Sequence, residues 1–330
     1  MQYVADVLKN GFEQSTIIQP DDYEGKVTAT LIRKRSAKPT AKAILCIHGF
    51  NDYFYQRIIA DEFLKQGYHF YALDLRKYGR SILQNHKPNN VRNLSEYYED
   101  IDSALSIIEA EGCEQIVLYG HSTGGLIITL YAADRKGKER FDTLVCNSPF
   151  YDFNVPWIQK KTVIPILALM GRLNPNIKLP IGFSKFYGKS LHKDDFGEWD
   201  YNLQWKPHTA PSINAGWVNA IHNGHLKIAD GVSVDKPILI MHSSISVYPL
   251  KWSEEMFRGD AILSVDDIVE KSKLIDSPHK DIIGFTDAIH DLVLSRKPTR
   301  NLVFETVFEW LDAFLENKSR AAIKQKAATL

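Results

Sequence analysis

The residue best placed to do chemistry in this sequence is a serine between glycines, in the pentapeptide Gly120-His121-Ser122-Thr123-Gly124. The pentapeptide follows the apolar run QIVLYG and precedes LIITLYAAD, a helical segment. A serine on a sharp strand-to-helix turn has a strained backbone that pushes its hydroxyl into a cleft, and flanking glycines let neighbouring chain pass closely. The alternative is a glycine-rich turn in which the serine has no chemical role. Such a turn would not need a strand directly before it and a helix directly after it. We therefore expect Ser122 to be a nucleophile that attacks a carbonyl.

His290 is the histidine expected to take the proton of that serine. A serine hydroxyl is a weak nucleophile at neutral pH, so a base must be held beside it. In strand–turn–helix sites of this kind the histidine follows the last strand of the sheet, and His290 follows the run DIIGFTDA. His279 precedes that run and would lie at the wrong end of the sheet. The alternative is that His290 is a surface histidine beside Asp291.

The acid that orients the histidine should follow the strand PILIMHS, but no carboxylate occurs there before Glu254. Asp260 opens the run Asp-Ala-Ile-Leu, whose apolar residues would anchor the acid beneath the histidine. Asp266 and Asp267 are the rivals, and each of them would alternatively cap the helix DIVEKSKLI. The expected triad is therefore Ser122, Asp260 and His290.

Acyl transfer also needs hydrogen-bond donors for the oxyanion that forms on the substrate. One donor is the backbone amide after the nucleophile, which here belongs to Thr123. The other comes from the loop after the strand AILCIHG, where the Phe50 amide is expected to donate and Gly49 lets the backbone turn inward. This chemistry needs no metal and no organic cofactor.

The elements that would position these residues alternate along the chain. Near-continuous apolar runs, typical of parallel strands covered on both faces, occur at residues 43–49, 69–75, 115–120, 143–149, 237–243 and 281–288. Helical spacing occurs at residues 55–66, 94–111, 124–133 and 301–316. Asn93 is the expected N-cap of the helix at 94–111. The helix at 301–316 would close one face of the sheet with Leu302, Phe304, Val307, Phe308 and Leu311. An antiparallel hairpin is expected between residues 12 and 35. This order predicts an α/β protein with a doubly wound, mostly parallel sheet.

The alternation is lost between residues 150 and 235, which predicts an insertion. Residues 1–150 and 236–330 would form the catalytic domain, and residues 151–235 a cap over the carboxyl ends of the strands. The cap region holds Trp157, Trp199, Trp205 and Trp217 and the apolar stretch VPWIQKKTVIPILALMGRL. These residues would line an acyl or aromatic pocket, or else form the small core of the cap itself. Contact of the cap with a membrane surface is the less favoured idea, because only Lys160 and Lys161 supply charge there.

Composition favours a small-molecule substrate. The 330 residues include 40 Lys+Arg and 40 Asp+Glu, so no net charge of one sign would attract nucleic acid. Two of the three cysteines, Cys46 and Cys146, lie in apolar runs, and with Cys113 they are expected to be structural thiols of a reducing compartment. No export signal and no stretch of membrane-spanning length is evident, which predicts a cytoplasmic protein.

At this point the motifs resemble the monoacylglycerol lipase, lysophospholipase and serine aminopeptidase group of α/β-hydrolases. The resemblance covers roughly residues 25–150 and 235–315, in the order HGFNDYFYQRIIADEFLKQGYHFYALDLRKYGRS, GHSTGG and PILIMHS, with His290 beyond. It implies the α/β-hydrolase fold, Ser122, Asp260 and His290 as triad, and the Phe50 and Thr123 amides as oxyanion donors. Departures from the family pattern are Lys77-Tyr78 in place of Gly-His, Asn51-Asp52 in place of Gly-Glu, and a longer acid-bearing loop.

The expected activity is cleavage of a carboxylic ester through an acyl-enzyme on Ser122. An amidase or aminopeptidase is the second hypothesis, in which a cap carboxylate among Asp194, Asp195, Glu198 and Asp200 would hold the substrate's amine. A catalytically inactive binding protein is the hypothesis from another class, although such a protein would usually lack the nucleophile or the histidine. A metal site formed by His208, His222 and His225 is disfavoured, because only Asp230 is close to them in sequence.

Overall fold

The computed structural model describes residues 1–179 and 185–327, with side chains up to residue 315. Its centre is a nine-stranded sheet in the order β1-β2-β3-β5-β4-β6-β7-β9-β11. The strands are β1 (Val4–Ala5), β2 (Glu13–Asp22), β3 (Gly25–Lys34), β4 (Lys42–Ile47), β5 (His69–Asp74), β6 (Gln115–His121), β7 (Thr143–Asn147), β9 (Ile238–Ser243) and β11 (Lys280–Phe285). From β5 to β11 all neighbours are parallel, as the apolar runs predict.

The parallel and antiparallel strands differ in how many of their faces are buried. Every residue of β5, β7 and β9 is buried, so these strands are covered on both faces. In contrast, β2 alternates between buried and exposed positions and pairs with β3 in the expected antiparallel hairpin. The hairpin joins the parallel strands through the antiparallel pairing of β3 with β5.

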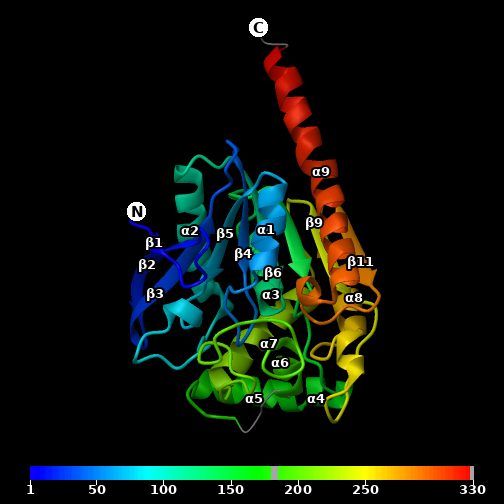
Figure 1. The fold of residues 1–330 in the computed structure, drawn as a ribbon. Helices are drawn as coiled ribbons and strands as arrows, with labels where there is room; N and C mark the ends of the chain where they lie inside the picture. Colours follow the sequence, from blue (N-terminus) through cyan, green and yellow to red (C-terminus); the bar gives the residue numbers. More distant parts are fainter. Residues whose placement is uncertain (180–184, 328–330) are drawn as a thin grey trace.

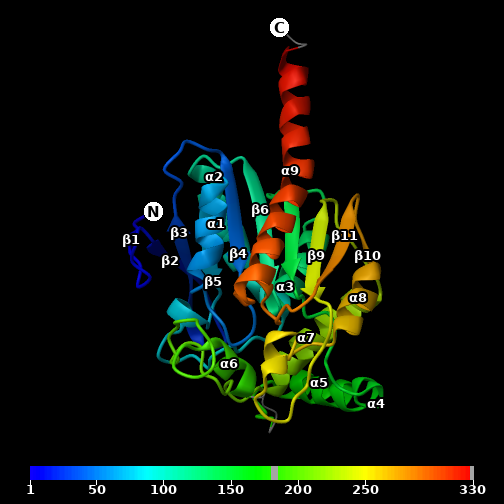
Figure 2. The same cartoon turned by 45° about the vertical axis from the view of Figure 1, so that its right-hand side comes forward.

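Helices cover both faces of the sheet (Figures 1 and 2). One face packs on α1 (Arg57–Lys65) and α9 (Lys297–Ala327), and the other on α2 (Tyr98–Ala110), α3 (Thr123–Asp134) and α8 (Val265–Lys273). In α9 the side chains of Phe304, Val307, Phe308 and Leu311 are buried against the sheet. Leu302, which the sequence placed on the same face, is 52% exposed, so that part of the prediction was wrong. The next residue, Val303, takes the buried position.

The described part of the segment between β7 and β9 carries four helices at the carboxyl ends of the strands, at the bottom of Figure 1. They are α4 (Trp157–Lys161), α5 (Val163–Leu173), α6 (Lys185–Leu191) and α7 (Ala215–Ala229), followed by β8 (Val232–Ser233), which pairs with β10 (Ile275–Asp276). Residues 180–184 of the expected insertion lie outside the described residues. The apolar side of α7 belongs to the same core as α2 and α3, because Trp217, Val218 and Ile221 pack there. Within the described residues, no helix is long and apolar enough to cross a membrane.

Candidate active site

Ser122 lies on a tight turn between β6 and α3. Its backbone has φ 53° and ψ −117°, a left-handed conformation that costs a non-glycine residue energy, and its amide donates to the Asn147 carbonyl at 2.9 Å. The flanking glycines allow neighbouring backbone to come close. A Cβ on Gly120 would lie 2.5 Å from the Gly124 carbonyl oxygen, and a Cβ on Gly124 would lie 2.4 Å from the Ile47 carbonyl oxygen. Only glycine fits at these two positions.

Asp260 and His290 form a buried pair at the end of the sheet. The Nδ1 atom of His290 is 2.8 Å from Oδ2 of Asp260, and both side chains are almost completely inaccessible to solvent. The other carboxylate oxygen, Oδ1, accepts the backbone amides of Ile262 and Leu263, each at 2.8 Å. These bonds fix the carboxylate in one orientation, so that Nδ1–H donates to it and Nε2 is left to accept a proton.

The two rival carboxylates occupy the first turn of α8, where their charge suits the positive end of the helix dipole. The residue that caps this helix is Ser264, whose hydroxyl accepts the Asp267 amide at 3.2 Å, so the expectation that Asp266 or Asp267 is the cap was wrong. The Asp267 carboxylate instead pairs with Lys160 at 2.6 Å. Neither rival contacts His290, whereas Asp260 does.

Ser122 and His290 line the same cavity, which measures about 740 Å³ with its open mouth included. The Ser122 hydroxyl makes no hydrogen bond to any of the residues that the structure describes. In free enzymes such bonds are often long and tighten only when substrate binds. A substrate in this cavity would therefore meet both the Ser122 hydroxyl and the His290 imidazole.

Aromatic and aliphatic side chains form most of the cavity wall. The Trp217 ring packs on Phe50 with centroids 4.7 Å apart and stacks on Phe150 at 6.5 Å. The other apolar lining comes from Tyr187, Tyr201, Pro207, Ala210, Ile262 and Leu263. Among the described residues that line this wall, Trp217 is the one tryptophan, and none of them belongs to residues 155–173. That stretch was expected to line a pocket or to form a cap core. Its Ile164 and Ala168 are buried and its Leu167 and Met170 pack against the core, whereas Trp157, Ile166 and Leu173 are exposed. Only part of the stretch is therefore core.

The two expected oxyanion donors lie on elements that meet at the serine. Thr123 is the first residue of α3, where backbone N–H groups have no partner within the helix. Phe50 follows Gly49, and a Cβ on Gly49 would lie 3.1 Å from the Ser122 Cβ. Phe50 and Thr123 both line the cavity. A substrate oxygen held between β4's loop and the start of α3 would therefore meet the backbone of both residues.

Three polar groups beside the serine were not recognised from the sequence. Asp52, one of the departures from the family pattern, is 2.9 Å from Nζ of Lys206 and 3.8 Å from Nδ1 of His121. Both ring nitrogens of His121 are buried and have no hydrogen-bond partner among the described residues. Burial holds the pKa of His121 well below its usual value, so this imidazole is neutral at pH 7. The family motif marks residues 51–52, but no local pattern shows that Lys206 meets them.

Asp291 is a second buried carboxylate, adjacent to the histidine in sequence. Its oxygens accept hydrogen bonds from Asn147 at 2.7 Å and from Gln56 at 3.3 Å, and burial raises its pKa. The Asp291 amide in turn donates to the Tyr187 hydroxyl at 3.1 Å. These contacts tie the loop that carries His290 to β7 and to the start of α1. The alternative that His290 is a surface histidine is wrong, because its side chain is buried.

The other departure from the family motif, Lys77, has a structural role away from the cavity. Its backbone adopts φ 66°, the left-handed conformation that glycine usually supplies at such a position. The completely buried side chain pairs with Asp22 at 2.6 Å and with Glu24 at 3.1 Å, and it lies 4.0 Å from the centre of the Tyr23 ring. Lys77 therefore anchors the turn of the β2–β3 hairpin to the loop after β5.

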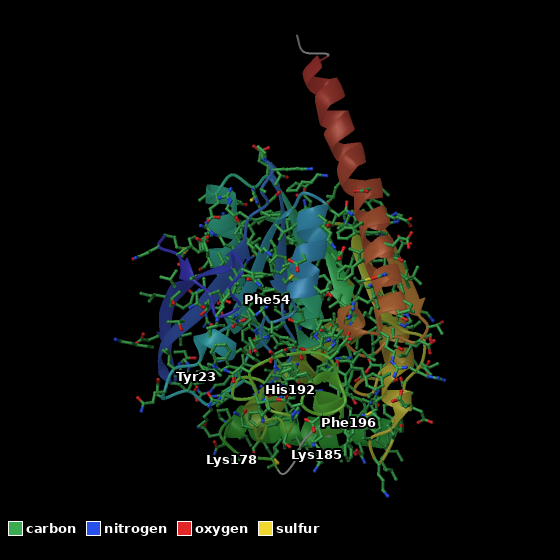
Figure 3. All side chains as sticks on the ribbon, viewed as in Figure 1. Tyr23, Phe54, Lys178, Lys185, His192 and Phe196 are labelled. Carbon is green, nitrogen blue, oxygen red and sulfur yellow. The ribbon has the colours of Figure 1, made fainter. Side chains whose placement is uncertain are left out.

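His208 lies near His192 and Asp195, not near the two histidines with which the sequence groups it. Within the described residues, these three could offer ligand atoms to a metal ion, all within 4.8 Å of one another. His192, labelled in Figure 3, accepts the Asp194 amide and bonds to the Tyr201 carbonyl, while Asp195 pairs with Lys189 and His208. Both ring nitrogens of His192 and the Asp195 carboxylate therefore already have protein partners. His225 packs against Phe150 and Phe153 and bonds to the Phe150 carbonyl.

The four acidic residues considered for binding a substrate amine do not line the cavity. Asp195 pairs with Lys189, Asp200 with Lys193 and Glu198 with Arg300, and Asp194 is exposed beside His192. Asp52 is the carboxylate on the cavity wall, and its charge is balanced by Lys206.

Comparisons with known proteins identify the family and the fold of this chain. A family model described as serine aminopeptidase, S33, matches residues 38–245, more than half of the chain. Among solved structures, a soluble variant of monoglyceride lipase from Saccharomyces cerevisiae, in complex with a substrate analog, is 17% identical with TM-score 0.65, covering 91% of this chain and 95% of that chain. Monoacylglycerol lipase of Paleococcus ferrophilus is 17% identical with TM-score 0.63, covering 86% and 99%.

Est1E from Butyrivibrio proteoclasticus with ferulic acid bound is also similar, at 17% identity and TM-score 0.56, covering 88% of this chain and 96% of that chain. At these identities the structures establish the fold, which is that of the α/β-hydrolases. The predicted fold class and the predicted resemblance are both confirmed. A search of curated protein sequences gave no match.

Proposed function

This chain belongs to the hydrolase family described as serine aminopeptidase, S33, and we propose that it cleaves a carboxylic ester through an acyl-enzyme on Ser122. The observation that carries the proposal is a hydrogen bond between His290 and the buried Asp260. His290 lines the same cavity as Ser122. Burying the Asp260 carboxylate costs free energy, because a charged group leaves water. A catalytically inactive binding protein would have no need for such a pairing.

The proposed reaction has two steps. In the first, the Ser122 Oγ attacks the ester carbonyl while Nε2 of His290 takes its proton; the tetrahedral intermediate then collapses, and the alcohol leaves with that proton. The Phe50 and Thr123 amides donate to the oxyanion, and Asp260 stabilises the imidazolium. In the second step, water attacks the acyl group, again giving its proton to His290, and the acid and the free serine are released.

The cavity wall supports an ester substrate with an apolar acyl or aromatic group. The rings of Phe50, Phe150 and Trp217 offer a contact surface that an acyl chain would bury. The hypothesis of an amine-recognising peptidase requires an unpaired carboxylate in the cavity. Asp52 is already paired with Lys206, and the four acidic residues considered for that role lie elsewhere. These contacts favour an ester over an N-terminal peptide as substrate.

The proposal includes a cap and a cellular location. We assign residues 151–235 to a cap and residues 1–150 and 236–330 to the catalytic domain, since α6, α7 and the chain between them supply Tyr187, Lys206 and Trp217 to the cavity. The three cysteines are free and buried, which fits a protein of the reducing cytoplasm.

The experiment that tests the proposal uses purified wild-type protein and Ser122→Ala with matched p-nitrophenyl esters and p-nitroanilides of the same acyl groups. We expect hydrolysis of the esters, orders of magnitude slower hydrolysis of the anilides, and loss of ester turnover in Ser122→Ala. Undiminished ester turnover by the variant would remove Ser122 as the nucleophile. If the anilides were hydrolysed faster than the esters, the amidase hypothesis would replace the esterase hypothesis.

A further inference from the structure

The loop that carries the Phe50 amide is fastened to the inserted segment by successive residues. Asn51 donates its side-chain amide to the Pro207 carbonyl at 2.9 Å, and Asp52 pairs with Lys206 at 2.9 Å. The Tyr53 hydroxyl accepts the Asn202 amide at 2.7 Å, and the Tyr53 ring meets Trp205 edge-on at 5.1 Å. We call this set of contacts, between residues 51–53 and residues 202–207, the clasp.

The ion pair of the clasp is desolvated. The Asp52 side chain is 2% exposed and that of Lys206 is 11% exposed, and Oδ1 of Asp52 also accepts the Tyr53 amide at 2.9 Å. The Lys206 ammonium lies 5.6 Å from the ring centre of Tyr55 and 5.8 Å from that of Tyr201. A buried pair tolerates little change in geometry, because each charge has left water and depends on the other. The pair therefore fixes the position of Asp52.

We propose that Lys206 is a positioning residue for the reaction, which acts through Asp52 to hold the Phe50 amide where the oxyanion forms. The proposal rests on the proposed function. Asp52 is two residues from Phe50, and between them Asn51 has φ 49°, a backbone conformation that must be held by its surroundings. Removing the Lys206 ammonium takes away the charged member of these supports. A displacement of about 1 Å at an oxyanion donor is enough to lower kcat by about 100-fold.

Lys206 also lines the cavity, so a direct role in binding an anionic substrate is the competing explanation. The two roles predict different kinetics. A positioning residue affects the transition state of every ester equally, so its loss lowers kcat and leaves KM nearly unchanged. A substrate-binding lysine affects KM, and its effect depends on the charge of the substrate. The balanced charge of Asp52 and Lys206 favours the positioning role.

The test compares Lys206→Met, Lys206→Arg and the control Lys193→Met, using p-nitrophenyl acetate and p-nitrophenyl butyrate. Lys193 lies on the same inserted segment and forms an exposed pair with Asp200, away from the cavity. We expect Lys206→Met to lower kcat by about 10- to 100-fold for both esters with KM within about 3-fold. Lys206→Arg should recover most of the loss, and Lys193→Met should match wild type. A change confined to KM, or unchanged kcat, would overturn the proposal.

A double variant guards against simple unfolding. Asp52→Asn with Lys206→Met removes both charges, so its melting temperature should exceed that of Lys206→Met, in which the buried Asp52 carboxylate has lost the ammonium that balances its charge. Its kcat should nevertheless stay low, because the ion pair that fixes the position of Asp52 is then missing, even though the contacts of Asn51 and Tyr53 remain. A double variant with wild-type kcat would show that only the unpaired charge mattered and would overturn the proposal. Ser122→Ala in the same assay separates the two proposals. If Ser122→Ala retains turnover, the proposed function fails. If Ser122→Ala is inactive and Lys206→Met has wild-type kcat, only the positioning role of Lys206 is refuted.

Discussion

Replacing Asp260 by asparagine would separate charge from shape at the buried acid. Its Oδ1 accepts two backbone amides, so the asparagine oxygen would take that position and leave its NH2 group facing His290. An NH2 group donates, which would force Nδ1 to accept and place the ring proton on Nε2. A protonated Nε2 cannot take the proton of Ser122. We therefore expect kcat to fall by about 10⁴-fold, with a loss of about 2 kcal/mol in the free energy of unfolding for the charged hydrogen bond.

The assay is hydrolysis of p-nitrophenyl butyrate across pH 6 to 9, together with unfolding in urea. Asp267→Asn is the matched control, because Asp267 is the rival acid and pairs with Lys160 at 2.6 Å, away from His290. Its kcat should stay within about 3-fold of wild type, since no group at the reaction centre changes. If Asp260→Asn kept wild-type kcat while Asp267→Asn lost it, the assignment of the acid would be wrong.

Three further changes test the packing around the site. Gly124→Ala would place a Cβ 2.4 Å from the Ile47 carbonyl oxygen, so we expect a loss of about 1–3 kcal/mol in unfolding free energy and lower turnover, measured by urea unfolding and ester assay. Trp217→Ala would widen the cavity, and kcat/KM for dodecanoyl relative to butanoyl esters should rise on the order of 10-fold in a chain-length series; an unchanged ratio would place the acyl group elsewhere. Burial lowers the pKa of His225 to about 3, whereas an unfolded histidine titrates near 6.5. Between these values the unfolded chain binds more protons, so stability falls as pH is lowered, by up to about 1.4 kcal/mol per pH unit from this group, and His225→Leu should flatten the dependence between pH 7 and pH 5.

The strands and the serine turn could be predicted because their signals are local. A continuous apolar run such as residues 69–75 describes a strand buried on both faces, and β5 is buried at every position. The turn at Ser122 requires glycine on both sides, and the close approaches of Gly120 and Gly124 to backbone atoms explain why. The fold class follows from the order of these elements, and the family model and the similar structures confirm it.

The remaining features depend on contacts between residues far apart in the chain. Asp260 could not be separated from its rivals by sequence, because the choice depends on which loop bends back beneath His290. The pairing of Asp52 with Lys206 joins the loop after β4 to the inserted segment, and no local sequence pattern predicts that these two residues meet. Leu302 was misplaced because a helical face is about one residue ambiguous at its edge, and Val303 packs inward in its place.

The most direct measurement of the central claim is the site of covalent labelling by a fluorophosphonate. The reagent should add once to the wild-type protein, and mass spectrometry of the digested protein should place the adduct on Ser122. Labelling should be lost in His290→Ala, because the hydroxyl then has no base. An active enzyme that carries its adduct on another residue, or that labels equally well without His290, would contradict the account.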